Sequence, residues 1–302
     1  MKVSVCVITY NHELFIEECL ISILSQKIDF EFEVIIGEDG SKDNTKHIIQ
    51  KIQNKYPGKI QLLPDEGNLG MMPNFIKTLN ACTGEYIAVC EGDDYWTDPN
   101  KLQKQVDFLE NNQDYVACYT DIQHYFEKDG STIDIIQDGI DTINISDLFI
   151  KNYVTTLTAV FRNGLLKIHE EFSSLSIGDW PLFTMLSQYG KIKRLPLITG
   201  VYRIHDSNYF QAKSYQEKKL KVTEATEFLY RHLHPPYRSL AGERLVDHYY
   251  VLAVLYGSAN QWDAAVEYYQ KMQGLISNAW SIKVLRLKII LFLYRVRNKI
   301  KL

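Results

Sequence analysis

The fold is decided by the stretch Tyr86-Ile87-Ala88-Val89-Cys90, which leads directly into Glu91-Gly92-Asp93-Asp94. Five apolar residues in a row are typical of a strand buried on both faces of a parallel sheet. Ligands of open α/β sheets bind beyond the carboxyl ends of the strands, which is where these carboxylates stand. The carboxylates of this segment predict a site for Mg²⁺ or Mn²⁺, in which phosphate groups of the substrate supply further ligands. The alternative is a solvated acidic turn ahead of a helix that begins at Asp98-Pro99.

Strands and helices alternate around this stretch. Apolar runs predict strands at residues 2–9, 32–36, 59–63 and 86–90, and helical spacing predicts helices at 15–24, 48–52, 75–81 and 101–111. The alternation predicts an α/β fold with a doubly wound, mostly parallel sheet flanked by helices. Farther along we expect strands at 115–126, 156–161 and 197–204, a loop or hairpin at 127–145 and a helix at 181–188.

The spacing of apolar residues changes near residue 211. Beyond Ser214 the apolar spacing is helical almost throughout, which predicts a sheet domain at 1–211 and a C-terminal helical region at 212–302. Residues 249–272 resemble one helical hairpin of the tetratricopeptide type. Because a repeat array needs neighbouring copies, we expect a plain αα-hairpin there.

Composition is that of an ordinary soluble globular protein, with 302 residues of which 46% are apolar and 23% charged. The net charge of −4 hides an asymmetry, because residues 281–302 carry seven Lys or Arg and no acid. The remaining 26 basic and 37 acidic residues give the body a net charge of −11, which makes nucleic acid an improbable partner. The five cysteines lack metal-ligand spacing, and Met1-Lys2 leads straight into a strand. Both features favour a cytoplasmic protein with reduced, buried thiols.

Several short motifs occur in a fixed order over the first 205 residues. They are Val7-Ile8-Thr9-Tyr10-Asn11, Gly37-Glu38-Asp39-Gly40-Ser41, Gly67-Asn68-Leu69-Gly70, Gly84-Glu85-Tyr86 with the acidic segment 91–94, Gly178-Asp179-Trp180 and Tyr202-Arg203-Ile204-His205. In this order and spacing the chain resembles the family 2 glycosyltransferases, which are inverting enzymes of the GT-A fold. The resemblance implies transfer of a sugar from a nucleotide-sugar donor to a glycan or lipid-linked acceptor, as in the synthesis of bacterial surface polysaccharides.

The resemblance also implies a nucleotide pocket. Asp39 matches the aspartate that accepts a hydrogen bond from N3–H of uracil, so a UDP-sugar is the expected donor. Thr9, Tyr10 and Asn11 form the other wall of this pocket, with Tyr10 stacking or donating its hydroxyl, and Asn68 and Asp93 complete the nucleotide-binding set. The alternative for Asp39 is a turn residue, since Asp-Gly-Ser-Lys-Asp is also good turn chemistry.

The acidic segment corresponds to the Asp-x-Asp metal signature of the family. Glu91 takes the place of the first Asp, and either Asp93 or Asp94 is the direct ligand of Mn²⁺ or Mg²⁺. The family often has a histidine near the diphosphate or metal at the position of His205, although a lone histidine can equally be structural. Arg203 can pair with phosphate or with a surface carboxylate.

Asp179 is the candidate catalytic base, because an attacking hydroxyl has to lose its proton to a nearby carboxylate. The family usually shows Glu-Asp here, with the second acid catalytic, whereas this chain has Gly178-Asp179. The alternative is a helix N-cap, since Asp179 stands two residues before Pro181.

Other classes of function compete with this interpretation. A sugar nucleotidyltransferase shares the sheet and the metal, but the loop after its first strand is Gly-rich and basic, unlike residues 9–13. A non-catalytic, membrane-associated scaffold has no reason to retain Asp39, Asp93, Asp94 and Asp179. A processive, membrane-spanning synthase is disfavoured because the Gln-x-x-Arg-Trp pattern and any run of 18 apolar residues are missing.

The basic segment 281–302 interleaves its cations with apolar residues, and Trp280 precedes it. This pattern predicts a helix that lies in the interface of an anionic membrane, on the inner face of the cytoplasmic membrane. The alternative is a terminal helix packed on the acidic body of its own chain or on a second subunit of a homo-oligomer.

Overall fold

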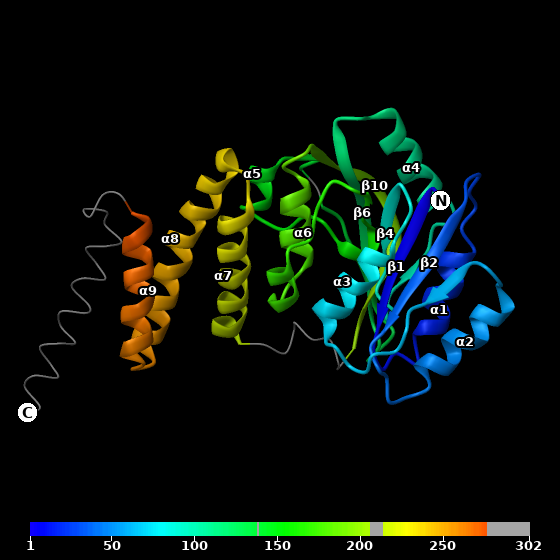
Figure 1. The fold of residues 1–302 in the computed structure, drawn as a ribbon, viewed down its shortest axis with the longest axis horizontal. Helices are drawn as coiled ribbons and strands as arrows, with labels where there is room; N and C mark the ends of the chain where they lie inside the picture. The colour runs from blue at the N-terminus through cyan, green and yellow to red at the C-terminus, as the bar shows by residue number, and fades with distance from the viewer. Residues whose placement is uncertain (138, 206–213, 277–302) are drawn as a thin grey trace, which may run out of the picture. The chain divides into compact units, whose positions relative to one another are not determined.

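A computed structural model describes residues 1–137, 139–205 and 214–276. The chain divides into two compact units, residues 1–208 and 209–302 (Figure 1). The expected domain boundary at 211 falls within 206–213, outside the described residues, and so does the basic segment 281–302.

The first half of the sheet is parallel, as predicted. Strands β1 (Val3–Thr9), β2 (Phe32–Glu38), β3 (Ile60–Leu62) and β4 (Tyr86–Val89) lie in the order β3-β2-β1-β4. Val5 pairs with Val34 on one side and with Ala88 on the other. The apolar runs form central strands because side chains on both of their faces are buried.

Helices cover both faces of this parallel region (Figure 1). Helices α1 (Ile16–Leu24), α2 (Thr45–Lys55) and α4 (Lys101–Asn111) contribute side chains to the same core cluster as Val3, Val5 and Val7. The opposite face carries α3 (Met71–Ala81), which contacts β1 and β2. The predicted doubly wound α/β fold is therefore confirmed.

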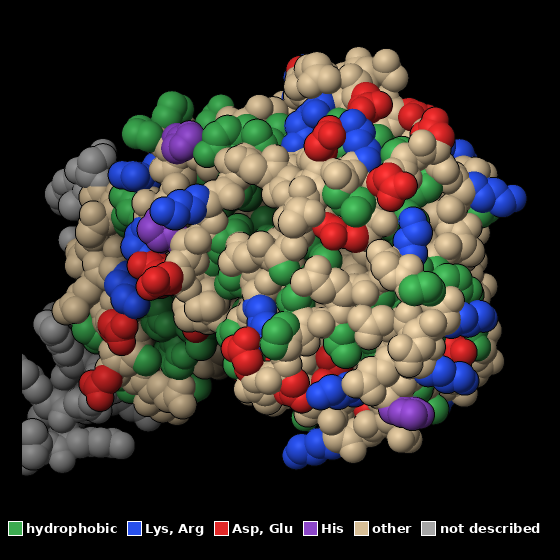
Figure 2. Space-filling view, turned by 45° about the vertical axis from the view of Figure 1, so that its right-hand side comes forward, with side chains coloured by type: hydrophobic (Ala, Val, Ile, Leu, Met, Phe, Trp, Pro, Cys, Tyr) green, Lys and Arg blue, Asp and Glu red, His purple; other side chains and the backbone are tan. Residues whose placement is uncertain are grey.

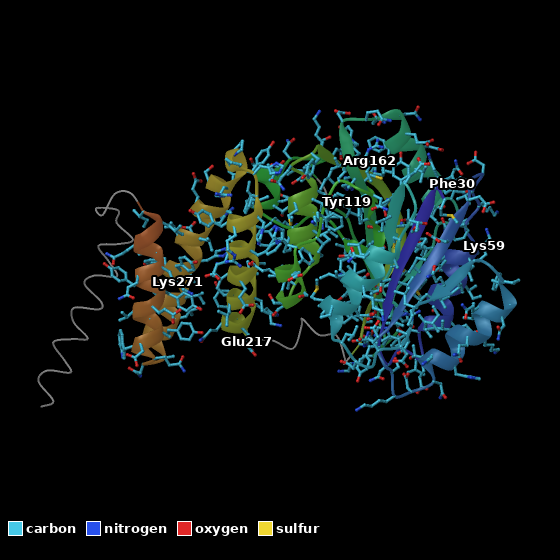
Figure 3. The ribbon with its side chains drawn as sticks, viewed as in Figure 1. Phe30, Lys59, Tyr119, Arg162, Glu217 and Lys271 are labelled. Carbon is cyan, nitrogen blue, oxygen red and sulfur yellow. The ribbon has the colours of Figure 1, made fainter. Side chains whose placement is uncertain are left out.

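The second half of the sheet is mixed. Strand β9 (Val160–Arg162) pairs antiparallel with both β4 and β6 (Tyr115–Phe126), and β10 (Lys191–Ile204) runs parallel to β6. The short β5 (Tyr95–Trp96) pairs antiparallel with β10. Arg162, labelled in Figure 3, ties β9 to its surroundings by donating Nε–H to the carbonyl of Tyr115 at 2.9 Å.

Three predicted elements differ from the structure, and the first is β10, which begins at Lys191 and not at the expected residue 197. The strand expected at 156–161 is split into the 3₁₀ helix η1 (Thr156–Thr158) and β9, because the hydroxyl of Thr158 donates to the carbonyls of Thr120 and Thr155. The helix expected at 181–188 is α6 (Asp179–Leu186) and begins two residues earlier.

The segment 127–145 forms a hairpin strand, β7 (Thr132–Ile135), which pairs with β6, and then β8 (Thr142–Ile143), which pairs with β10. Helix α5 (Ile145–Leu148) and the 3₁₀ helix η2 (Glu170–Ser174) complete the sheet unit.

The described part of the second unit is helical, as expected. Helices α7 (Tyr215–His232), α8 (Pro235–Ser258) and α9 (Trp262–Leu275) follow one another, and α7 begins with a capping box of Ser214 and Glu217. The αα-hairpin predicted at 249–272 consists of α8 and α9, whose shared core holds Tyr249, Ala253 and Met272.

On the face shown in Figure 2, basic and acidic side chains are interspersed over the surface. Within the described ranges, no helix combines the length and the apolar character that crossing a membrane requires.

Candidate active site

The carboxyl ends of β1, β2 and β4 meet at one edge of the sheet, because these strands are parallel neighbours. This topology brings three predicted segments together: Thr9–Asn11 after β1, Asp39 after β2 and the acidic turn 91–94 after β4. The sheet thus places the predicted nucleotide and metal residues on one rim, where ligands of open α/β sheets bind.

The loop after β1 is fastened to the loop after β2. The backbone N–H of Asp39 donates to the carbonyl of Thr9 at 3.0 Å. Asn11 has a φ of 55°, a left-handed conformation that asparagine tolerates better than most residues. Its backbone N–H donates to Ser41 Oγ at 2.9 Å, and its Oδ1 accepts from the backbone N–H of Lys42 at 2.9 Å. Tyr10 is left partly exposed on the same rim.

Asp39 is buried and holds the loop after β3 in place. Its Oδ1 accepts from the backbone N–H of Leu69 at 2.7 Å, and its Oδ2 accepts from that of Gly70 at 3.0 Å. Gly40 has a φ of +69°, and a Cβ there would come within 2.9 Å of the backbone N of Asn68. The three segments predicted to bind the nucleotide are therefore mutually connected, and Asp39 serves this connection whatever else it binds.

The acidic turn is built around Gly92. Its backbone N–H donates to the carbonyl of Ile8 at 2.9 Å, and a Cβ at this position would meet Thr9 Oγ1 at 2.6 Å. Glycine is therefore required for the turn to approach the end of β1 closely.

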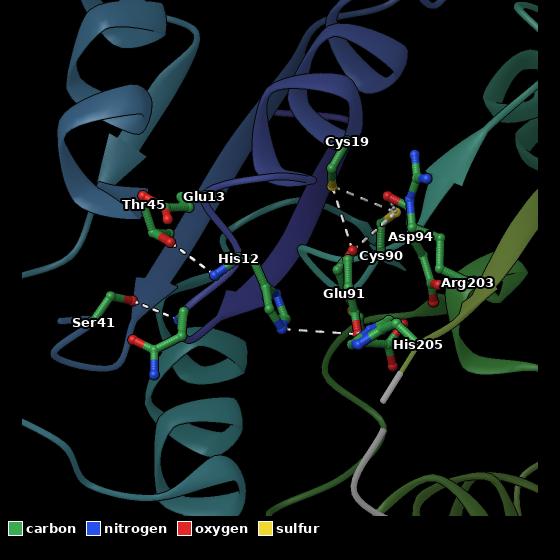
Figure 4. A network of polar contacts seen from close by, with 12 residues as sticks. His12, Glu13, Cys19, Ser41, Thr45, Cys90, Glu91, Asp94, Arg203 and His205 are labelled. Carbon is green, nitrogen blue, oxygen red and sulfur yellow. Dashed lines mark hydrogen bonds and ion pairs between the residues drawn. The ribbon is translucent and has the colours of Figure 1, made fainter. Parts of the chain in front are cut away.

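Asp93 lies between His12 and His205, the two histidines that Figure 4 labels. Its Oδ2 is 3.1 Å from Nε2 of His205 and 3.8 Å from Nε2 of His12. Burial works to raise the pKa of Asp93, but the hydrogen bond from His205 and the two imidazole charges lower it, and the net shift is downward. Asp93 is thus held as a carboxylate.

Asp94 has a different environment. It is 2% exposed, and its Oδ1 accepts from the backbone N–H of Arg203 at 2.9 Å. Burial and the charges of Asp93 and Glu91 raise its pKa well above the usual range. The Arg203 side chain pairs with Glu18 and Glu127. We expected Arg203 to pair with phosphate or with a surface carboxylate, and in this structure its side chain pairs with carboxylates.

The predicted metal ligands are only partly brought together. Asp93 and His205 are in contact, whereas Asp94 is taken up by the backbone of Arg203. Across 1–137, 139–205 and 214–276, no group of three or more His, Cys, Asp or Glu side chains is arranged to hold a metal ion. Within the expected set Glu91, Asp93, Asp94 and His205, the structure brings Asp93 and His205 into direct contact.

Three buried polar atoms around Gly92 nevertheless have no hydrogen-bond partner among the described residues: Thr9 Oγ1, His12 Nδ1 and Glu91 Oε2. Burial, followed by the charges of Asp93 and Asp179, raises the pKa of Glu91 to about 8. Such groups are costly unless a ligand satisfies them. With the Asp93–His205 pair they offer oxygen and nitrogen donors that would suit a divalent cation.

Asp179 is the first residue of α6, and the N-cap position belongs to Gly178, so the alternative role as an N-cap does not apply. Its Oδ2 accepts from Nδ2 of Asn152 at 2.8 Å. Burial raises its pKa, although hydrogen bonds from the Trp180 backbone and Asn152 oppose the shift. Asp179 shares a cavity of about 280 Å³ with Glu91, Asp94, His124 and Tyr202.

Gly178, where the family pattern has Glu, lies against Met72 of α3. A Cβ at Gly178 would lie 2.4 Å from Cε and 2.7 Å from Sδ of Met72, so the flexible end of this α3 side chain would have to move for a larger residue.

Two residues of this site were missed by sequence reasoning. His12 stands one residue beyond the first motif and could have been found from that position. Asn152 lies in a stretch without a motif, and no sequence signal distinguishes it.

Comparison with known proteins places this geometry in context. A model of the family described as Glycosyl transferase family 2 matches residues 4–164. The uncharacterized protein Rv1520 of Mycobacterium tuberculosis is 33% identical over 203 residues, which are 67% of this chain and 58% of the relative. The chain thus spans less than two thirds of the length of this relative.

Two solved structures share the fold. Staphylococcus aureus TarS 1–349, in complex with UDP, has a TM-score of 0.65 at 21% identity, with 96% of this chain and 88% of that chain covered. The mannosyltransferase PcManGT from Pyrobaculum calidifontis, in complex with GDP-Man and Mn²⁺, has a TM-score of 0.59 at 16% identity, with 98% and 86% covered.

Proposed function

This chain belongs to glycosyl transferase family 2, and we propose that it is an inverting, non-processive glycosyltransferase that moves a sugar from a nucleoside diphosphate to an acceptor hydroxyl. The proposal rests on one observation, that Asp179 lines the same cavity as Glu91 and Asp94 of the acidic turn. A base and a diphosphate site have to flank the anomeric carbon in such a reaction. The family match favours glycosyl transfer over nucleotidyl transfer or a scaffold role.

The donor we propose is a UDP-sugar. Asp39, Thr9–Asn11 and Asn68 border the rim beside β1 and β2, and Asp39 retains lone pairs for a base N–H because a carboxylate has about four acceptor sites. TarS, which shares the fold, was solved with UDP. PcManGT was solved with GDP-Man, so the choice of base needs its own experiment.

A divalent cation fits beside the proposed diphosphate position. Asp93 and His205 would hold it, with Glu91 and the Thr9 hydroxyl available to its water ligands. The chemistry that Mn²⁺ or Mg²⁺ supplies is neutralisation of the charge that builds on the leaving diphosphate.

Asp179 is the proposed base. It takes the proton of the acceptor hydroxyl while that oxygen forms a bond to the anomeric carbon. The bond between this carbon and the β-phosphate oxygen breaks, and its electron pair leaves with the diphosphate on the opposite side, which inverts the carbon. A pKa raised by burial brings Asp179 nearer to the operating pH, where a general base works best.

The acceptor we propose is a hydroxyl of a lipid-linked or surface-polysaccharide precursor, an assignment that rests on the family resemblance. Membrane attachment through 281–302 remains a prediction from the charge pattern of that segment.

Thermal unfolding in the presence of UDP, GDP and dTDP, each with and without Mn²⁺, tests the nucleotide assignment. UDP with Mn²⁺ should raise the melting temperature most, because a ligand at about 100 times its Kd stabilises by about 2.7 kcal/mol. A larger shift with GDP or dTDP would overturn the uridine assignment, and equal shifts with and without Mn²⁺ would overturn the cation site.

A further inference from the structure

Asn152 touches the proposed base from a segment with no family motif. Its Nδ2 donates to Oδ2 of Asp179 at 2.8 Å across 27 residues of sequence. The orientation of its amide is fixed at the other end, because Asn152 Oδ1 accepts from the backbone N–H of Val154 at 3.3 Å. This second bond identifies the amide atom that faces Asp179 as nitrogen, a donor.

The segment that carries Asn152 is anchored to the same turn of α6 as the base. Trp180, the neighbour of Asp179, donates its indole Nε1–H to the carbonyl of Leu148 at 2.7 Å. The rings of Trp180 and Phe149 also pack edge to face with centroids 5.9 Å apart. Asp179 and Trp180 thus each contact residues 148–152, which ties the segment that carries Asn152 to the start of α6.

We propose that Asn152 is a positioning residue for the transfer reaction. Its hydrogen bond occupies Oδ2 of Asp179 and fixes the rotation of the carboxylate, so that Oδ1 receives the proton of the acceptor hydroxyl. This inference rests on the proposed function, because it assumes that Asp179 is the base.

The surroundings of Asp179 make such a donor useful. Glu91 and Asp94 from the acidic turn, His124 from β6 and Tyr202 from β10 line the same cavity. Two of these four groups are acids. The neutral amide of Asn152 can hold the Asp179 carboxylate among them without adding a positive charge, which would compete for the diphosphate. The donor favours the charged form of Asp179, and its loss favours the protonated form, which is inactive as a base.

The test compares Asn152→Ala and Asn152→Asp with the wild-type chain. The assay is Mn²⁺-dependent hydrolysis of whichever of UDP-glucose, UDP-galactose and UDP-N-acetylglucosamine the wild-type chain hydrolyses fastest, with water as the acceptor. We expect Asn152→Ala to lower kcat about tenfold, to leave KM for the donor unchanged and to move the acidic limb of the kcat profile up by about one pH unit. Asn152→Asp keeps the shape of the side chain but replaces the N–H group that bonds Asp179 by a carboxylate oxygen, and it should lower kcat further.

Asn112→Ala is a matched control, since Asn112 makes one partly buried amide bond, to the carbonyl of Phe108 at 2.7 Å. It should leave kcat and the pH profile unchanged. An unmoved acidic limb in both Asn152 variants, with folding intact by circular dichroism, would overturn the positioning role.

Asp179→Asn separates this outcome from failure of the proposed function. If Asp179→Asn is inactive and the Asn152 variants behave as wild type, the inference about Asn152 alone is wrong. If Asp179→Asn remains fully active, or if the wild-type chain hydrolyses none of the donors, the proposed function is wrong.

Discussion

His205 Nε2 lies 3.1 Å from Oδ2 of Asp93, although 112 residues separate them. The antiparallel pairing of β5 with β10, with Tyr95 opposite Val201, explains this contact. Because β5 follows the acidic turn directly, the pairing draws Asp93 toward the end of β10. The backbone N–H of Arg203 also donates to Oδ1 of Asp94 at 2.9 Å, which joins the acidic turn to β10 a second time. The pairing of the two-residue strand β5 with β10 therefore brings together Asp93 and His205, the two residues proposed to hold the cation.

Asp93→Asn tests that site. The amide keeps the shape of the carboxylate but loses its charge, so Mn²⁺ should no longer add to the stabilisation by UDP. We expect UDP with Mn²⁺ to raise the melting temperature of this variant no more than UDP alone. Asp107→Asn, a change at an exposed position on α4, should retain the full Mn²⁺ effect. A full Mn²⁺ effect in Asp93→Asn would show that Asp93 is not a ligand.

Asp179→Asn tests the base. The variant should bind UDP nearly as tightly as the wild-type chain, because Asp179 belongs to the cavity beside the acidic turn and not to the nucleotide loops. Loss of a general base should lower kcat by about 10²–10⁴. Single-turnover kinetics and UDP titration measure the two effects separately, and near-normal turnover would assign Asp179 a purely structural role.

The parallel half of the fold was predictable because burial on both faces leaves β1, β2 and β4 mostly apolar. The start of β10 was missed, since three of the four residues of Lys191–Arg194 are basic and the run does not look buried. Arg194 is nevertheless 5% exposed, because Asp121 neutralises it through two hydrogen bonds of 2.8 and 2.6 Å. Such a pairing across 73 residues leaves no local signal.

The site shows the same limit. Asp39, Asp93 and Asp179 follow predicted strands or precede a predicted helix, so their order could be recognised in the sequence. The contacts that decide what each carboxylate does come from distant residues: Leu69 and Gly70 for Asp39, His205 for Asp93 and Asn152 for Asp179. The sequence therefore indicated which acids are candidates for the site, but not the contacts that hold each of them.

Lys101→Met should stabilise the sheet unit. The Lys101 side chain is fully buried, its Nζ has no hydrogen-bond partner among the described residues, and it lies 4.0 Å from the ring centroid of Trp96. Burial lowers its pKa from 10.5 to about 7. Methionine keeps the apolar stem and removes the charge. After allowance for the lost cation–π contact, we expect the free energy of unfolding at pH 7 to rise by about 2 kcal/mol.

The stability gained by Lys101→Met should depend on pH, because Lys101 titrates at a lower pH in the folded chain than in the unfolded chain. Between pH 7 and 10.5 the unfolded chain binds more protons at Lys101 than the folded chain, so the wild-type protein gains stability from this group as pH rises. The advantage of Lys101→Met should therefore shrink between pH 7 and pH 9.5 in urea unfolding. Lys104→Met, an exposed change on the same helix, should alter stability by less than about 0.5 kcal/mol. Destabilisation by Lys101→Met would mean that the Trp96 contact outweighs burial of the charge.

Gly178→Glu tests how far Met72 hinders the acid pair of the family, because a Cβ at this position would meet Cε of Met72 at 2.4 Å. Overpacking there should lower the free energy of unfolding by about 1–3 kcal/mol. Met72→Ala removes the obstructing atoms, so the cost of Gly178→Glu should fall by about 1 kcal/mol or more in the Met72→Ala background.

Gly274→Glu is the matched control, since a Cβ there has no atom within 4 Å, and its cost should not depend on Met72. Urea unfolding of the four chains of the cycle gives the coupling energy directly. Additive costs would show that Met72 is not the obstacle and that the fold itself tolerates an acid beside Asp179.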